Sequence, residues 1–344
     1  RVDNANEQFD LSSIDTDTLK NMQSEHEMRT VIMETEEDQM MYNNIERDIQ
    51  NELNDYNHIR YLIAQKEDDE IEAGLNILKE FINNAKDLVR EDIDMSELCV
   101  GLKCGGSDGF SGITANPTVG KVSDTIISFG GSAILSEVPE MFGAEQILMN
   151  KCKDINVFKR YKQLILDFKN YYIKQGFPVY ENPSPGNKDG GISTLEEKSL
   201  GCITKAGTSE IVDVLNYGEL VKEKGLSILD GPGNDLIAAT SLGASGCQIV
   251  LFTTGRGTPF STFVPTLKIS SNNYIGGHKP HWIDFNAYPM GNEALYSLIM
   301  ETVNGTYKTK SESNHEIAFY KKGVTLWVLL KTKHGLEKNL KKIH

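Results

Sequence analysis

The spacing of hydrophobic positions changes along the chain at about residue 98. Before that point, apolar residues recur three and four positions apart, a spacing typical of amphipathic helices. One series contains Tyr42, Ile45, Ile49, Leu53 and Tyr56, and a second contains Ile71, Leu75, Leu78 and Ile82. After that point, short apolar runs alternate with helical patterns. The pattern predicts a largely helical segment over residues 38–85, followed by a domain of alternating strands and helices.

The short apolar runs define the expected strands. We expect strands at 98–102, 132–138, 225–229 and 248–252, helices at 117–129 and 161–174, and a late strand pair at 315–320 and 324–330. Asn116 suits the N-cap of the first helix, and Pro117 suits its first helical position. Because helical crossovers separate the strands, we expect an α/β fold with a mainly parallel sheet and flanking helices.

Charge is distributed unevenly along the chain. Residues 1–60 carry 15 acidic and 5 basic side chains, whereas the formal net charge of the whole chain is −14. We expect an acidic, partly helical amino-terminal arm over 1–60, an α/β domain over 61–326 and a basic tail over 327–344. The arm is expected to pack on the main domain or on a partner subunit, and a catalytic role for it is the lesser alternative.

Composition narrows the classes of function. The net charge of −14 argues against nucleic acid as a partner. No stretch of 18 apolar residues exists, so no membrane span is expected. The five cysteines form no CxxC pair, which favours free thiols in a reducing compartment, so a cytoplasmic location is expected.

A glycine-rich run follows the first strand, from Cys104 to Gly112, with the sequence CGGSDGFSG. Glycines let the backbone approach a ligand closely, and the following helix turns its free N–H groups toward the loop. The run lacks the Gly-Lys-Ser/Thr ending of a Walker loop and the GxGxxG spacing of a dinucleotide site. We expect Gly105, Gly106 and Ser107 to bind a polar substrate; the alternative is a tight turn between strand and helix.

Carboxylates gather at several expected strand ends, where ligands of open α/β sheets bind. Glu137 and Glu140 follow the strand at 132–138, and Asp108 lies in the glycine loop. These three residues are the expected ligands of a divalent metal, and Asp108 is also a candidate catalytic residue. The alternatives are a solvated strand end for the two glutamates and, for Asp230 and Asp235, capping of the next helix.

The expected cations are few. Arg256 lies between two glycines, a position suited to gripping a carboxylate. Lys188 lies in the loop at 182–191, and Lys198 follows two glutamates that it could merely balance. Arg256, Lys188 and Lys198 are the candidate catalytic cations, and we expect the glycine loop and Arg256 to share one pocket.

Three further polar residues, Asn187, Thr254 and Lys268, are candidate substrate contacts. The chain contains no GxSxG elbow and no HExxH motif. Hard oxygen ligands combined with a few cations suit metal-assisted removal of a proton beside a carboxylate better than acyl transfer.

These segments resemble the altronate and D-galactarate dehydratase family of sugar-acid lyases. The matching blocks are 104–112, 114–117, 133–140, 143–145, 182–188, 197–201, 252–257, Pro265 with Lys268, 282–287 and 323–326. The resemblance covers about residues 65–326, the carboxy-terminal catalytic region of such enzymes. It implies that 61–326 is a dehydratase-like catalytic domain.

The resemblance implies β-elimination of water from a sugar acid such as altronate or galactarate, giving a 2-keto-3-deoxy acid. It also implies a divalent metal, Fe²⁺ or Mn²⁺ first, with Mg²⁺ or Ca²⁺ as alternatives. Residues 1–60 do not resemble the small β-rich amino-terminal domain of family members, and 327–344 extends beyond where they tend to stop. The protein could act alone or work with a separate subunit that supplies the small domain, and a homo-oligomer is a further alternative.

Two alternatives to a sugar-acid dehydratase follow from the same resemblance. One is a non-catalytic paralogue or subunit that binds a sugar acid. The other is the large subunit of a sulfo-lyase acting on a sulfonated hydroxy acid, because such lyases also resemble the family.

Overall fold

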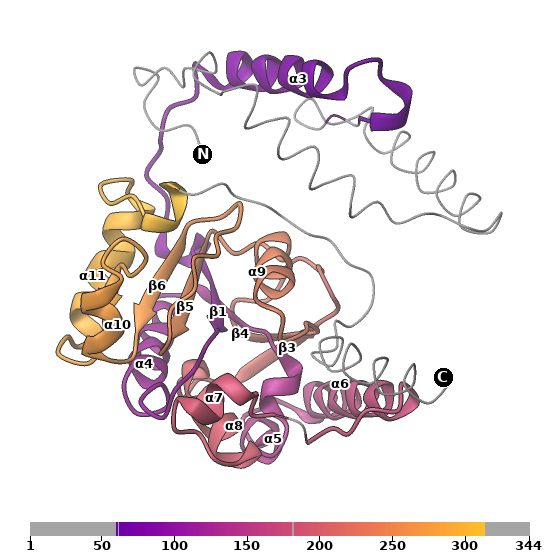
Figure 1. Cartoon of the computed structure of the whole chain (residues 1–344), viewed down its shortest axis with the longest axis vertical. Coiled ribbons are helices and arrows are strands. Elements are labelled where there is room, and N and C mark those ends of the chain that lie inside the picture. The colour runs from indigo at the N-terminus through magenta and orange to yellow at the C-terminus, as the bar shows by residue number, and fades with distance from the viewer. Residues whose placement is uncertain (1–59, 61, 181, 314–344) are drawn as a thin grey trace, which may run out of the picture. The chain divides into compact units, whose positions relative to one another are not determined.

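The computed structural model describes residues 60, 62–180 and 182–313 and divides the chain into two compact units, 1–92 and 93–344. In the first unit, a 3-10 turn (Ala64–Lys66) precedes helix α3 (Glu70–Ala85) (Figure 1). The Asp69 side chain caps α3 by accepting hydrogen bonds from the backbone of Ile71 and Glu72. The helix expected around Ile71 and Leu75 is thus confirmed, whereas the series from Tyr42 to Tyr56 lies outside the described residues.

The second unit is built on a seven-stranded sheet in which every pair of neighbouring strands is parallel. The strand order is β3-β4-β2-β1-β5-β6-β7. The strands are β1 (Cys99–Cys104), β2 (Ser132–Leu135), β3 (Ile211–Leu215), β4 (Gly225–Leu229), β5 (Ile249–Thr254), β6 (Thr266–Ser270) and β7 (Phe285–Asn286). The expected α/β fold with a parallel sheet is confirmed.

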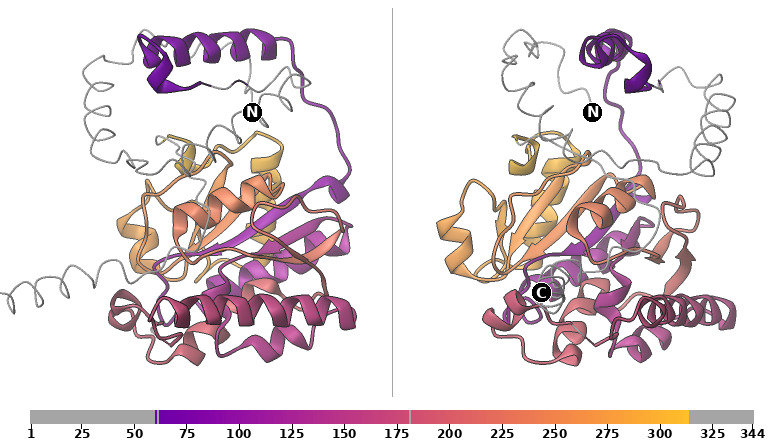
Figure 2. Two further views of the ribbon diagram at one scale, coloured as in Figure 1. Left: turned by 90° about the vertical axis from the view of Figure 1, so that its right-hand side faces the viewer. Right: turned by 45° about the vertical axis from the view of Figure 1, so that its right-hand side comes forward.

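Helices cover both faces of this sheet, as the two views of Figure 2 show. Helix α9 (Asp235–Ala244) packs on β1 and β5, whereas α4 (Ala115–Ser128), α6 (Ile155–Lys174) and α11 (Asn292–Val303) belong to the opposite layer. The shorter helices are α5 (Glu145–Met149), α7 (Pro185–Asp189), α8 (Leu195–Ile203) and α10 (Asn273–His278). Short 3-10 turns lie at Met95–Glu97, Val138–Met141, Thr204–Ala206 and Lys310–Ser313.

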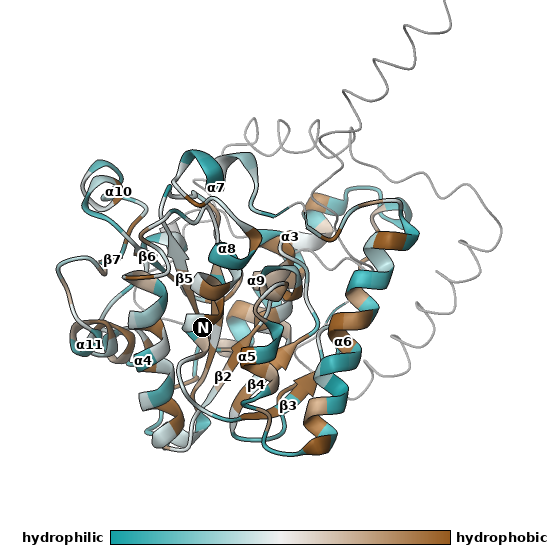
Figure 3. Cartoon of the chain, turned by 90° about the horizontal axis from the view of Figure 1, so that it is seen from below, coloured by the Kyte–Doolittle hydropathy of each residue, from teal (hydrophilic) through white to brown (hydrophobic). Residues whose placement is uncertain are grey.

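Burial of the sheet on both faces explains the apolar runs that mark its strands. Along β1, Val100 and Leu102 enter the core beneath α4, whereas Cys99 enters the core beneath α9. Helix α6 is amphipathic instead, and Figure 3 shows hydrophilic and hydrophobic residues alternating along it. None of the described helices is both long enough and apolar enough to cross a membrane.

Two local expectations were wrong. Helix α4 begins at Ala115 rather than Pro117, and its N-cap is Thr114. Asn116 is therefore a buried helical residue whose side chain donates to the Gly201 carbonyl at 2.8 Å. The segment 182–191, expected to be a loop, contains α7, which is capped by reciprocal hydrogen bonds within its first turn.

Other expectations fall beyond the described residues. The late strand pair at 315–320 and 324–330 lies there, as does the tail at 327–344. The domain boundaries expected at residues 60 and 326 stay predictions.

The connections that leave β1 and β5 run in opposite directions, which marks the space between these two strands as a candidate ligand site. The chain leaves β1 through α4 toward β2 on one side, and it leaves β5 toward β6 on the other side. Loops that diverge from neighbouring parallel strands leave a crevice at their carboxyl ends, where α/β proteins bind ligands. The glycine loop and the segment containing Arg256 both begin at this point.

Gly120 tests how closely α4 packs on the turn after α8. A Cβ atom at Gly120 would lie 2.2 Å from the Thr204 carbonyl oxygen and 3.0 Å from the Gly207 nitrogen. We expect Gly120→Ala to reduce the free energy of unfolding by about 1–3 kcal/mol through overpacking, measured by urea denaturation. Gly277→Ala, in a helix with open space around the new methyl group, is the control and should not destabilise. Equal effects of the two variants would contradict the close packing.

Candidate functional site

The glycine loop after β1 is tied to the end of β5 by backbone hydrogen bonds. Gly105 donates to the Thr253 carbonyl at 3.0 Å, and the N–H groups of Gly255 and Arg256 donate to the Gly106 carbonyl at 3.1 and 3.0 Å. Gly106 has φ +61°, a conformation that favours glycine. The structure therefore places the backbone of Arg256 directly against the loop, whereas a pocket that the two share stays a prediction.

Asp108 organises this loop. Its Oδ1 accepts hydrogen bonds from the backbone and hydroxyl of Ser111 and from the Ser271 hydroxyl, at 2.7–2.9 Å. Its Oδ2 accepts from Asn272 Nδ2 at 2.8 Å. A Cβ on Gly255 would lie 2.2 Å from the Asp108 carboxyl carbon. The backbone after β5 can therefore pass this close to Asp108 only because residue 255 is glycine. With both oxygens occupied, Asp108 is suited to holding the loop in place.

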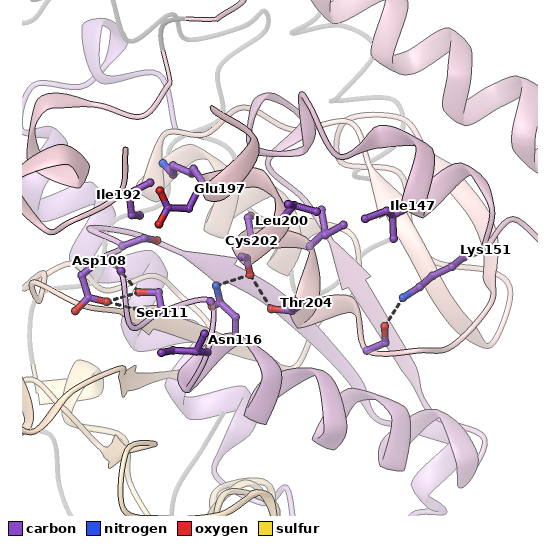
Figure 4. A pocket seen from close by; sticks show the side chains of 18 residues that line it. Asp108, Ser111, Asn116, Ile147, Lys151, Ile192, Glu197, Leu200, Cys202 and Thr204 are labelled. Carbon is purple, nitrogen blue, oxygen red and sulfur yellow. Dashed lines mark hydrogen bonds between the residues drawn. The ribbon is translucent and has the colours of Figure 1, made fainter. Parts of the chain in front are cut away.

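A pocket of about 610 Å³ opens beside the loop. Figure 4 shows Asp108, Ser111 and Asn116 along one wall, with Glu197, Leu200 and Cys202 across from them. The loop after β1 thus faces α8 across the cavity. The lining also includes Ser107, Gly109, Gly112, Ile113, Ile147, Lys151, Ile192, Lys198, Gly201, Ile203, Thr204 and Gly207, but not Arg256.

Lys198 is the buried cation of this lining. Its Nζ forms an ion pair with Glu140, 2.7 Å from Oε2, but the angles are not those of a hydrogen bond. It also donates hydrogen bonds to Asn187 Oδ1 at 2.9 Å and to Asn182 Oδ1 at 3.1 Å. Burial disfavours its charge, but the Glu140 carboxylate raises the pKa of Lys198 above its usual value. Asn187 also donates to the Ser107 carbonyl at 2.9 Å, which links α7 to the glycine loop.

A second buried lysine, Lys103, lies in β1 and joins several strand ends. Its Nζ lies 2.5 Å from Glu137 Oε1 and 2.9 Å from Asp235 Oδ1, and it donates to the Cys104 carbonyl. Glu137 Oε2 accepts from the Cys104 N–H at 2.9 Å. Glu137 has φ +69°, and it is the single described non-glycine residue with positive φ. Strain of this kind persists where surrounding contacts fix the backbone.

Two thiols lie close to the Glu137 carboxylate. Cys104 Sγ lies 3.7 Å from Cys202 Sγ and 3.8 Å from Glu137 Oε1. Lys205 Nζ donates to Cys202 Sγ at 3.0 Å and lies 3.6 Å from Glu137 Oε2. Cys104, Glu137, Cys202, Lys103 and Lys205 are all buried, and we call these five side chains the buried cluster.

The cluster shifts the proton affinities of its members. A hydrogen bond from the Cys202 thiol lowers the pKa of Cys104 well below its usual value, and nearby ammonium groups act in the same direction. The pKa of Cys202 is raised, because it donates that bond and is buried. Burial, together with the nearby Cys104, raises the pKa of Glu137 to about 8 despite its two lysine neighbours. Within the thiol pair, the cluster therefore favours the proton on Cys202 rather than on Cys104.

Cys104, Glu137 and Cys202 could also hold a metal ion, because their ligand atoms lie within 4.8 Å of one another. Among the described residues, Glu137, Glu140 and Asp108 do not form such a group. Of the three expected ligands, the structure thus places Glu137 with two thiols that the sequence analysis did not assign to a metal.

The remaining candidate residues lie in different surroundings. Arg256 is about half exposed and donates from Nη1 to the Gly186 carbonyl at 2.5 Å. Lys188 is exposed on α7. Thr254 is buried and accepts a hydrogen bond from the Gly257 N–H at 2.9 Å. These residues border the glycine loop or α7 rather than the buried cluster.

Lys268 lies on β6, away from the pocket lining. Its side chain is buried, and its Nζ donates to the Thr258 carbonyl at 2.8 Å. Burial lowers its pKa to about 8, although the carboxylates of Asp284 and Asp235 oppose the shift. A substrate contact by Lys268 stays a prediction.

Sequence reasoning missed Lys103, Cys202 and Lys205. A usable signal was present, because Lys198, Cys202 and Lys205 recur four and three positions apart. This spacing places them on one side of α8 and the turn that follows it. The spacing would have drawn attention to Cys202, one residue beyond the block 197–201.

Comparisons with known proteins agree on one family. A family model described as D-galactarate/altronate dehydratase, C-terminal, matches residues 95–325. An altronate dehydratase of Bacillus subtilis (strain 168) is 55% identical over 278 residues, covering 78% of this chain and 56% of that protein. An altronate dehydratase of Escherichia coli (strain K12) is 50% identical over 282 residues, covering 79% and 57%.

A more distant relative is named a (2R)-sulfolactate sulfo-lyase subunit beta, from Chromohalobacter salexigens. It is 31% identical over 256 residues, covering 69% of this chain and 64% of that protein. The matches to the two altronate dehydratases span little more than half of those proteins.

The contribution of Lys103 to stability can be measured directly. Lys103→Met keeps the length of the side chain but removes the cation closest to the buried Glu137. Breaking one partner of a buried pair costs about 3–5 kcal/mol, so we expect a loss of this size in the free energy of unfolding. Urea denaturation followed by circular dichroism measures it.

Lys153→Met is the matched control for this measurement, because it breaks a solvent-exposed pair with Glu223. The control should lose less than about 1 kcal/mol. Similar losses in the two variants would show that Lys103 has no special structural role.

Proposed function

Because this chain belongs to the D-galactarate/altronate dehydratase family, we propose that it catalyses the elimination of water from a sugar acid such as altronate or galactarate. The product would be a 2-keto-3-deoxy acid. The main support is its 50–55% identity to two altronate dehydratases. The fold adds a pocket beside the glycine loop that follows the carboxyl end of β1.

The reaction breaks a C–H bond beside the carboxylate and a C–O bond on the next carbon. Negative charge then accumulates on the carboxylate oxygens, so preorganised cations lower the barrier. Lys198 lines the pocket and would hold the developing charge. Arg256 and Lys188 would bind a carboxylate of the substrate from the loop side.

Polar groups around the loop would orient the hydroxyls. Gly105, Gly106 and Ser107 would approach the substrate from β1, and Asn187 would do so from α7. Asp108 would act by fixing the loop, because its oxygens already accept four hydrogen bonds. Thr254 and Lys268 complete the candidate contacts from β5 and β6.

The donor chemistry of Cys104, Glu137 and Cys202 fits a divalent transition metal. Thiol ligands favour Fe²⁺ over Mn²⁺ and disfavour Mg²⁺ and Ca²⁺, which prefer oxygen. When bound, such an ion supplies Lewis-acid stabilisation of the charge that forms during the elimination. In the structure, the ammonium groups of Lys103 and Lys205 contact these same donors, so metal binding would compete with them. Glu140 and Asp108 remain further candidates for oxygen ligands.

A sulfo-lyase reaction is the second candidate, supported by the 31% identity to a sulfo-lyase subunit beta. The higher identity to altronate dehydratases favours water as the leaving group. Because the chain covers just over half of those relatives, catalysis could require a second polypeptide or a homo-oligomer. A sugar-acid-binding subunit without activity of its own is the third candidate.

A substrate panel distinguishes these functions. We expect the full chain, supplied with Fe²⁺ or Mn²⁺, to release 2-keto-3-deoxy acid from altronate or galactarate, detected as the keto acid. Chelation with EDTA should abolish release, and the metal should restore it. Sulfite release from a sulfonated hydroxy acid would establish the sulfo-lyase instead. The assay is repeated after addition of the amino-terminal part of the Bacillus relative. If the chain binds altronate but shows no turnover with or without this addition, it is a binding subunit.

The variant Arg256→Lys tests whether Arg256 binds a carboxylate of the substrate. A guanidinium can make two parallel hydrogen bonds to a carboxylate, and an ammonium cannot. We expect kcat/KM to fall about 10- to 100-fold, the equivalent of a lost charge-assisted hydrogen bond. The melting temperature should change little, because Arg256 is half exposed.

Arg160→Lys is the matched control, since Arg160 also donates to a backbone carbonyl but does so beside β3. Its kcat/KM should stay unchanged. An unchanged kcat/KM in Arg256→Lys would remove Arg256 from the substrate site, and a collapsed melting temperature would assign it a structural role.

A further inference from the structure

Two pairs of free thiols lie at the same separation in this fold. Cys104 Sγ and Cys202 Sγ are 3.7 Å apart, and so are Cys99 Sγ and Cys247 Sγ. In each pair, both residues are buried and come from distant parts of the sequence. Since a disulfide bond is about 2.05 Å long, either pair needs only a small approach of the sulfurs to join.

The surroundings of the two pairs differ. Cys202 is a lining residue of the pocket, so a small polar molecule that enters the pocket lies next to this residue. Cys99 and Cys247 lie instead in the apolar core beneath α9, with Ile134, Leu229, Leu242, Val250 and Phe252. Neither residue of that pair lines the pocket.

A proton donor also distinguishes the pocket pair. Lys205 Nζ lies 3.0 Å from Cys202 Sγ, and no charged side chain contacts the sulfurs of Cys99 and Cys247 in the described part of the chain. Attack of a thiol on a peroxide expels an oxygen that must take up a proton. A buried ammonium beside one sulfur is placed to supply it.

We propose that Cys104 and Cys202 form a reversible disulfide when a small hydroperoxide enters the pocket. The Cys202 thiol first passes its proton to the Cys104 sulfur, which lies 3.7 Å away. The resulting Cys202 thiolate attacks one oxygen of hydrogen peroxide and becomes a sulfenic acid, and the other oxygen takes a proton from Lys205 and leaves as water. The Cys104 sulfur then displaces the sulfenic oxygen as a second water and forms the S–S bond. Overall, two thiols are oxidised by two electrons, and one peroxide is reduced to two waters.

The bond would also dismantle the buried cluster. Both sulfurs would be lost as metal donors, and Cys202 would no longer accept a hydrogen bond as a thiol from Lys205. The expected loss of dehydratase activity rests on the proposed function. Formation of the bond itself does not, so the two ideas fail separately.

Peptide mapping of the full chain tests the bond. The protein is first freed of metal with EDTA and then treated with hydrogen peroxide, and free thiols are alkylated before digestion and mass spectrometry. We expect a peptide linked through Cys104 and Cys202 that disappears after dithiothreitol. Its formation should be at least about tenfold faster than linkage of Cys99 to Cys247, which peroxide cannot reach.

Single substitutions distinguish the reactivity of the Cys104–Cys202 pair from an effect of misfolding. Cys202→Ser should abolish the linked peptide, whereas Cys247→Ser, at the sealed pair, should leave its rate unchanged. Lys205→Met should slow the linkage of Cys104 to Cys202, because it removes the proton donor while the distance between the two sulfurs stays the same. If Cys202→Ser fails to fold, the comparison of the two pairs within the wild-type chain still decides the matter. Equal rates at the two pairs, or oxidation of Cys104 or Cys202 to higher acids without linkage, would overturn the proposal.

Discussion

The arrangement of the candidate site depends on one buried ammonium group, that of Lys103. It contacts Glu137 after β2 and Asp235 at the start of α9, while its own backbone belongs to β1. A buried carboxylate without a cation is strongly disfavoured, so the buried Glu137 depends on this lysine together with Lys205. Asp235 is partly exposed and joins the same ammonium group from α9. The lysine thereby fixes the ends of neighbouring strands relative to one another at the edge where the pocket opens.

This constraint accounts for two local features that are otherwise unusual. Glu137 adopts φ +69° because its carboxylate must reach Lys103 and the Cys104 N–H together. Gly105 must be glycine because a Cβ there would lie 2.5 Å from the Phe252 ring and 2.7 Å from the Asp235 carboxylate. The strain at Glu137 thus accompanies the ion pair with Lys103, and the glycine at 105 leaves room for both Phe252 and Asp235.

Much of the fold could be predicted from sequence because buried parallel strands are apolar throughout. β4 coincides with the expected run 225–229. β6 was missed, since Thr266, Lys268 and Ser270 are buried but polar and interrupt the apolar pattern. α7 was missed because the proline, glycine and asparagine that indicate a turn also begin a capped helix.

The candidate site was predictable to a smaller extent. The glycine loop and Arg256 stand out by local composition, and the structure brings them into contact. Lys103 and Lys205 do not stand out, because in sequence a buried lysine looks like any surface lysine. Their importance arises from tertiary burial, which depends on partners far along the chain.

Those distances along the chain have a consequence for how the protein acquires its site. Lys103 and Asp235 are separated by 132 positions, and Cys104 and Cys202 by 98. Contacts between distant residues carry a large loop-closure entropy and form slowly, and parallel sheets contain many of them. The pocket therefore has no locally folded precursor. It should appear late, in the same cooperative step that docks α8 and α9 onto β1, and no fragment that lacks one of these elements can contain a complete site.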